Sequence, residues 1–154
     1  MEISIQQSID LNNFEAYLVK LKEGVDPFSR DEDGRTVLHA IAYMKDEGPV
    51  SRFFSRTKSS CDYFMEIRHY LIDDCVRKLT LQDKFGNTAL HIAIRRENWR
   101  IATIIGNYLY RDSLHSNYRV NHDGVNEFQL ALELYGSHGR SSEIAQIFPW
   151  ENRA

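Results

Sequence analysis

Two stretches of this 154-residue chain share one pattern: "DEDGRTVLHAIA", from Asp31 to Ala42, and "DKFGNTALHIAI", from Asp83 to Ile94. Aligned without a gap, they have an Asp, a Gly, a Thr, a Leu and a His in common. Identities at fixed offsets indicate an internal repeat, and a repeat decides the architecture of a chain before any other feature does. The shared residues are Asp31 and Asp83, Gly34 and Gly86, Thr36 and Thr88, Leu38 and Leu90, and His39 and His91.

A third and weaker copy is "NHDGVNEFQLAL", from Asn121 to Leu132. Gly124 keeps the place of the glycine, whereas Asn126 and Gln129 replace the Thr and the His. Amide side chains can make some of the same hydrogen bonds as Thr and His. We therefore expect the third copy to fold as the first two do.

The pattern D-x-x-G-x-T-x-L-H resembles that of the ankyrin repeat. The resemblance implies an all-α fold, an ankyrin-repeat solenoid of about four helix-turn-helix units that forms a single domain over residues 1–154. The expected units are a partial N-terminal unit over 1–30, a repeat over 31–82, a repeat over 83–120 and a degenerate C-terminal repeat over 121–150.

The spacing of the glycines predicts an insertion in the first full repeat. Gly34 and Gly86 are 52 positions apart, against about 33 in a regular repeat. The motif before the extra residues fits the pattern, and so does the helix expected over 64–76 after them. The insertion is therefore expected at about 45–62.

The other helices follow from the same register. In the repeat over 83–120, the inner helix is expected over 88–95 and the outer helix over 99–109. In the last repeat, Ser141 or Ser142 is predicted to cap the final helix, since a serine hydroxyl can accept from the first free backbone N–H groups.

His39 and His91 could serve as catalytic bases or metal ligands. Because each recurs at the same point of the repeat, three residues after a Thr, we expect them to hydrogen-bond that Thr and the loop backbone instead. Cys61 and Cys75 lack the close spacing of a zinc site. The chain also has no nucleophile elbow, phosphate loop or dinucleotide motif. We expect no enzyme activity and no catalytic, cofactor or metal site.

The composition of the chain limits the classes of partner that we expect it to bind. The formal charge of −3 and the pI near 6.1 provide no broad positive field for nucleic acid or anionic membranes. No apolar run approaches the roughly 20 residues that cross a bilayer, and the N-terminus has no secretory pattern. We expect an intracellular protein that is located in the cytoplasm or also in the nucleus. We also expect it to be a monomer when free and to bind a protein partner.

Candidate contact residues lie at the loop tips. Glu32 and Asp33 in the first copy differ from Lys84 and Phe85 in the second, and Asp31 completes the acidic tip of the first copy. The acidic tip is either a solvated turn or a site for a basic peptide. The insertion adds Arg52, Phe53 and Phe54, which either fold back on the repeat or form a contact arm for a partner.

The order of the units, with "FGNTALHIA" in the middle and "NWRIATII" (Asn98 to Ile105) in an outer helix, resembles the short virus-encoded IκB-like proteins called vankyrins. The resemblance implies an inhibitor that binds NF-κB (Rel) transcription factors, lacks the regulatory degradation tails and suppresses immune signalling. Asp31, Glu32 and Asp33 would then pair with the basic nuclear-localisation segment of a Rel protein. The alternative is an ankyrin-repeat effector of an intracellular bacterium, or a cellular adaptor, that binds a different protein.

Overall fold

The computed structural model describes residues 3–44, 58–71, 74–110, 118–137 and 139–152. Within these ranges every regular element is a helix and no strand occurs, which confirms the all-α prediction. The α-helices are α1 (Ile5–Asp10), α2 (Phe14–Lys22), α3 (Val37–Tyr43), α5 (Ser60–Ile67), α6 (Cys75–Leu79), α7 (Ala89–Arg95), α8 (Trp99–Tyr110), α9 (Glu127–Tyr135) and α10 (Ser141–Ile147). Two short 3-10 helices, η1 (Arg68–Leu71) and η3 (Pro149–Asn152), follow α5 and α10. None of the described helices is long and apolar enough to span a bilayer.

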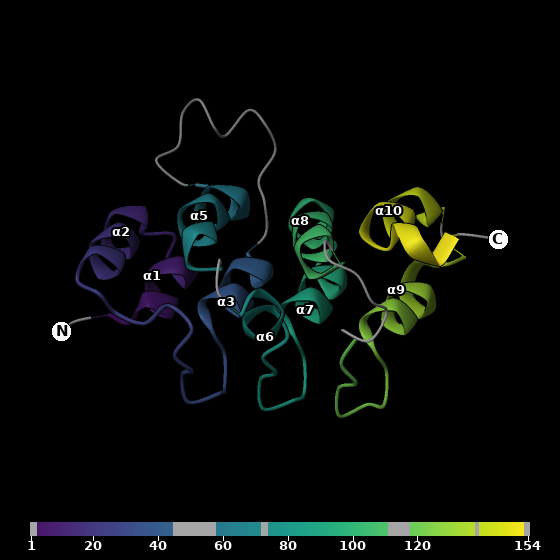
Figure 1. Cartoon of the computed structure of the whole chain (residues 1–154), viewed down its shortest axis with the longest axis horizontal. Helices are drawn as coiled ribbons and strands as arrows, with labels where there is room; N and C mark the ends of the chain where they lie inside the picture. The colour runs from purple at the N-terminus through teal and green to yellow at the C-terminus, as the bar shows by residue number, and fades with distance from the viewer. Residues whose placement is uncertain (1–2, 45–57, 72–73, 111–117, 138, 153–154) are drawn as a thin grey trace.

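The helices lie in two rows (Figure 1). In the inner row α1, α3, α7 and α9 pack side by side in that order. In the outer row α5 packs on α8 and α8 on α10, while α2 lies beside α1. Loops over 31–35, 83–87 and 121–125 extend from the same side of the inner row (Figure 1). Each helix pair therefore stacks on the next, and one apolar core runs between the rows.

Apolar side chains from both rows fill this core. Leu38 and Leu90, the leucines of the repeated motif, are 1% and 0% exposed. Burying a side chain of this size contributes roughly 1.5–3 kcal/mol. The ring centroids of Tyr17 and Tyr63 are 4.8 Å apart, and the Tyr17 hydroxyl donates to the Tyr63 carbonyl oxygen at 2.9 Å. These contacts attach α2 to α5 across the first unit boundary.

The first unit contains an inner helix that the sequence analysis did not identify. Helix α1 begins after Ser4, whose hydroxyl accepts from the N–H of Gln7 at 3.1 Å, while the Gln7 side chain accepts from the Ser4 N–H at 2.8 Å. This reciprocal pair is a capping box, which satisfies two N–H groups at the start of the helix. Residues 1–30 therefore contribute both α1 and α2, and the S-x-x-Q signal at Ser4 could have predicted it.

The predicted insertion over 45–62 ends too late. Residues 45–57 lie outside the described residues, but Ser59 already caps α5: its N–H donates to the Asp62 carboxylate at 2.9 Å. The Asp62 N–H in turn donates to the Ser59 hydroxyl at 3.3 Å. The apolar run that predicted this helix begins only at Phe64, five residues after the Ser59 cap.

The continuous helix predicted over 64–76 is also wrong. Helix α5 ends at Ile67, η1 follows, and a separate α6 begins at Cys75. Asp74 has a φ of +54°, a left-handed backbone conformation that an α-helix cannot include. The apolar spacing that predicted one helix therefore spans two separate helices, α5 and α6.

The helices of the next unit lie where the register predicts them. Helices α7 and α8 begin and end within one residue of the expected 88–95 and 99–109. The cap of α10 differs from the prediction, because Arg140 takes the cap position without a side-chain bond and Ser141 is already helical. The Ser142 hydroxyl donates to the Glu143 carboxylate at 3.0 Å instead.

Candidate functional site

The three loops share one internal hydrogen-bond pattern. In each loop the side-chain oxygen of the first residue accepts from the backbone N–H groups two and four positions later, at distances of 2.8 to 3.2 Å. The three first residues are Asp31, Asp83 and Asn121. Such bonds hold a turn closed. The Asp31 carboxylate, predicted as a partner contact, is therefore partly occupied within its own loop.

Thr36 and Thr88 cap the helices that follow the first two loops. The N–H of each Thr donates to Nδ1 of the His three residues later at 3.0 Å. Because Nδ1 accepts this bond, we place the ring proton on Nε2. Nε2 of His39 then donates to the Asn87 carbonyl oxygen at 2.8 Å, and Nε2 of His91 donates to the Val125 carbonyl oxygen at 3.2 Å.

Both imidazoles are structural, as the repetition predicts. Each joins the cap of its own helix to the backbone of the next loop. Burial is the main cause that lowers the pKa of His39 below its usual range and the pKa of His91 to about 4. Both rings are therefore neutral near pH 7, which suits a buried hydrogen-bonding group.

The third copy uses amides for the same cap. The Asn126 N–H donates to the Gln129 side-chain oxygen at 2.8 Å, and the Gln129 N–H donates to the Asn126 side-chain oxygen at 2.8 Å. This pair confirms the expectation that amides can replace Thr and His at these positions.

Glu127, the first residue of α9, is a buried carboxyl that the sequence analysis missed. It is 0% exposed, and its two oxygens accept from the Arg119 N–H at 2.8 Å and from the Thr88 hydroxyl at 3.2 Å. Burial raises its pKa to about 7. The available signal was its alignment with Val37 and Ala89, apolar residues at the same position in the other copies.

A groove of about 670 Å³ lies along the inner row, where α3 and α7 meet the loops. Its floor includes Ala40 and Ile92. Tyr43 and Phe85 line it as well and are 53% and 59% exposed. Large exposed aromatic side chains in a concave surface are typical of a contact site.

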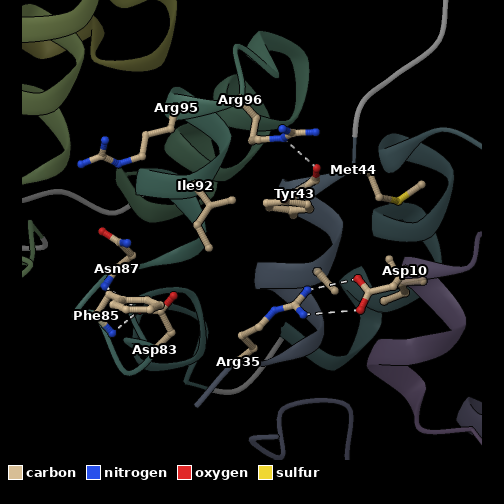
Figure 2. Close-up of a pocket in the computed structure, with 12 residues that line it drawn as sticks. Asp10, Arg35, Tyr43, Met44, Asp83, Phe85, Asn87, Ile92, Arg95 and Arg96 are labelled. Atoms are coloured by element: carbon tan, nitrogen blue, oxygen red, sulfur yellow. Dashed lines mark hydrogen bonds and ion pairs between the residues drawn. The ribbon is translucent and has the colours of Figure 1, made fainter. Parts of the chain in front are cut away.

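Charged side chains stand at the two ends of the groove (Figure 2). Arg95 and Arg96 lie at the end of α7, while Arg35 and Asp83 lie near the loops. The Arg96 guanidinium carbon lies 4.3 Å from the Tyr43 ring centroid, and Arg96 Nε donates to the Tyr43 carbonyl oxygen at 3.1 Å. The aromatic ring and the cation are therefore in direct contact in the wall of the groove.

The predicted contact residues at the loop tips partly bind one another. Lys84 Nζ lies 2.7 Å from the Asp33 carboxylate, and the Lys84 N–H donates to the Asp33 carbonyl oxygen at 2.8 Å. The bond from Lys84 lowers the pKa of the Asp33 carboxyl. Glu32 is exposed, and Phe85 lines the groove. Arg52, Phe53 and Phe54 lie outside the described residues.

No group of three His, Cys, Asp or Glu side chains that could hold a metal occurs among the described residues. A scan of the chain against protein-family models finds no matching family, and no curated protein matches its sequence.

Proposed function

We propose that this chain is a protein-binding ankyrin-repeat module that holds a segment of its partner in the groove along α3 and α7. The observation that supports this most is the exposure of Tyr43 and Phe85, 53% and 59%, in the groove along the inner row. Repeat stacks present extended concave surfaces of this kind. Three copies of one loop, each followed by a capped helix, support the assignment to ankyrin repeats.

The chemistry of the groove favours binding over catalysis. His39 and His91, the side chains best suited to act as general bases, are 1% and 0% exposed and do not line it. Both are neutral and bonded to loop carbonyl oxygens. The groove instead offers apolar and aromatic contact area with arginine at its wall, the composition of binding hot spots.

The finer proposal is that the partner is a Rel-homology transcription factor and that the chain inhibits it, as its resemblance to short IκB-like proteins implies. The contacts of Asp31 and Asp33 give less support than the sequence alone does to a charge pair between this acidic loop and a basic segment of the Rel protein. Asp31 holds its own loop and Asp33 pairs with Lys84. Contacts in the groove are the better-supported route. The alternative, an effector or adaptor for another protein, would use Arg52, Phe53 and Phe54.

Site-specific photocrosslinking tests both levels of the proposal. A benzophenone amino acid replaces Tyr43 or Phe85 in the groove, and in a control it replaces Tyr70, an aromatic residue of η1 that is 40% exposed outside the groove. The variants are irradiated with a purified Rel-homology domain and, separately, with cell extract, and the adducts are resolved by mass spectrometry.

We expect protein adducts from positions 43 and 85 and none from position 70. Adducts only from position 70, or from no position, would reject the groove as a protein-binding site. A complex with the Rel-homology domain at micromolar concentration supports the finer proposal. Its absence, combined with groove adducts to another protein, would keep the groove as the binding site but reject a Rel-homology partner.

A further inference from the structure

The groove along α3 and α7 has a charge opposite to that of the whole chain. Three arginines and two aspartates line it, whereas the chain as a whole has a net charge of −3. Asp10 and Arg35 form an ion pair at 3.1 Å and offset each other. The Asp83 carboxylate accepts from the N–H groups of Phe85 and Asn87 and holds their loop.

Arg95 and Arg96 therefore set the charge that a partner meets at the end of α7. The Arg96 guanidinium is oriented by the Tyr43 ring, and no carboxylate pairs with it in the described part of the chain. Arg95 lies 3.7 Å from the Asp123 carboxylate, which is 78% exposed. Exposed ion pairs of this kind contribute little, so a carboxylate of the partner can replace Asp123.

The apolar part of the groove lies beside these two cations. Ala40 and Ile92 line it, and Figure 2 shows Tyr43 and Phe85 on either side of Ile92. A volume of about 670 Å³ has room for large side chains of a peptide. Arg95 and Arg96 lie at the same end of the groove, above Ile92 in Figure 2, and their side chains extend to opposite sides.

We propose that the groove binds an acidic peptide segment whose central large apolar side chain packs on Ile92, Tyr43 and Phe85. Carboxylates next to that side chain pair with Arg95 and Arg96, since a guanidinium can hold a carboxylate by two parallel hydrogen bonds. This inference rests on the proposed protein-binding function and adds the charge and shape of the partner. It also reverses the sign expected from the acidic loop, which predicted a basic segment.

The same cations could attract nucleic acid, but two observations favour a peptide. Asp10 and Asp83 lie in the same groove, where they would face the phosphates of a polynucleotide. The net charge of −3 repels a polyanion at long range, whereas a short acidic peptide with an apolar anchor gains most of its affinity from contact.

Selection from a phage-displayed library of random 12-residue peptides tests the inference on the full chain. We expect enriched sequences with Asp or Glu on either side of Phe, Trp, Leu or Ile. The dissociation constant of a synthetic enriched peptide should rise about tenfold or more in the double variant Arg95→Ala/Arg96→Ala. It should stay within twofold in the matched control Arg68→Ala/Arg100→Ala, which removes the same charge from exposed positions outside the groove.

Two further measurements keep the result decisive. Phe85→Ala, at an exposed position, should weaken the same peptide about fivefold or more even if the double arginine variant folds poorly. Oligothymidine of 20 nucleotides should bind at least tenfold more weakly than the peptide.

Basic or uncharged enriched peptides, no enrichment, equal loss in the control, or oligothymidine binding as tight as the peptide would each overturn the inference. Basic peptides that still crosslink from position 85 would overturn only the partner's charge. The absence of any protein adduct from positions 43 and 85 would overturn the proposed function itself.

Discussion

His39 and His91 join neighbouring units of this fold through single side chains. Each ring accepts from its own Thr through Nδ1 and donates to the next loop through Nε2. A buried imidazole can make both bonds only in its neutral form. The depressed pKa of His91, about 4, therefore means that its contribution to stability is present above pH 6.5 and is lost as pH falls toward 4.

The titration of Glu127 changes the stability of the fold with pH in the direction opposite to that of His91. Its pKa in the folded chain is raised from 4.5 to about 7 by burial, so the folded state holds the proton more tightly than the unfolded state does. The resulting stability is fully present below pH 4.5 and is lost as pH rises through 7. Between pH 4.5 and 6.5 the effects of His91 and Glu127 oppose each other, and above pH 6.5 Glu127 dominates the pair.

The substitution Glu127→Gln should remove the loss of folding stability that accompanies ionisation of the Glu127 carboxyl at rising pH. An amide can accept from the Arg119 N–H and donate to the Thr88 hydroxyl oxygen, so the junction keeps its bonds. Between pH 6 and 8 the free energy of unfolding of the unchanged chain should fall by about 1 kcal/mol more than that of the variant. Urea unfolding at pH 6, 7 and 8 measures both slopes, and equal slopes would mean that the Glu127 carboxyl does not titrate in this range.

The backbone conformation of the three loops explains why glycine recurs in the motif. Gly34, Gly86 and Gly124 have φ values of +76°, +80° and +81°, which cost an L-residue roughly 1–2 kcal/mol. Two of these loops also bring the next loop close. The His122 N–H donates to the Phe85 carbonyl oxygen at 3.0 Å, and a Cβ on Gly86 would lie 2.8 Å from the same His122 nitrogen.

Alanine at the three glycines should therefore cost increasing amounts of stability along the series Gly124, Gly34, Gly86. A Cβ at Gly124 meets no atom within 4 Å, and one at Gly34 meets the Lys84 nitrogen at 3.2 Å. We expect Gly124→Ala to lose only the backbone strain, about 1 kcal/mol, and Gly86→Ala to lose at least about 2 kcal/mol more, because loop contacts must break. Denaturant unfolding of the three variants measures the series. Equal losses would show that strain alone selects glycine.

The described helices form a row of units with apolar packing between neighbouring helices at every boundary, and two of the boundaries also have hydrogen bonds between loops. Met44 and Ser60, which lie before and after residues 45–57, contact the same side chain in this row. Asn98 Nδ2 donates to the Met44 carbonyl oxygen at 3.0 Å and lies 3.3 Å from the Ser60 hydroxyl oxygen. The two ends of the insertion are thus held by a single amide, and a short connection can join them.

Replacing residues 45–57 by Gly-Ser-Gly-Ser should preserve the fold. Shortening the closed segment should leave the free energy of unfolding unchanged or raise it by about 1 kcal/mol, since a shorter loop loses less entropy. Circular dichroism and urea unfolding measure the outcome, and a variant that no longer unfolds cooperatively would contradict it. With the fold intact, lost partner binding would assign the contact to Arg52, Phe53 and Phe54.

The sequence by itself determined the local parts of this protein. The loop turns, the Thr and His caps, the all-helical class and the bounds of α7 and α8 follow from residues within four positions of one another or from simple periodicity. Local signals were also present where the prediction was wrong: Ser4 with Gln7 and Ser59 with Asp62 are capping pairs that apolar spacing alone does not reveal.

Only the tertiary structure decided the rest, because it depends on pairs far apart in the chain. Asp33 meets Lys84, Arg96 stacks on Tyr43, and Thr88 binds Glu127 across 51, 53 and 39 positions. A charge that looks available in the sequence is occupied once the loops stack, and a glutamate that looks solvated becomes buried at a unit boundary. The positive charge of the groove arises for the same reason. Packing places Arg95 and Arg96 beside exposed aromatic rings, and the net charge of a sequence does not say where each charged side chain lies in the fold.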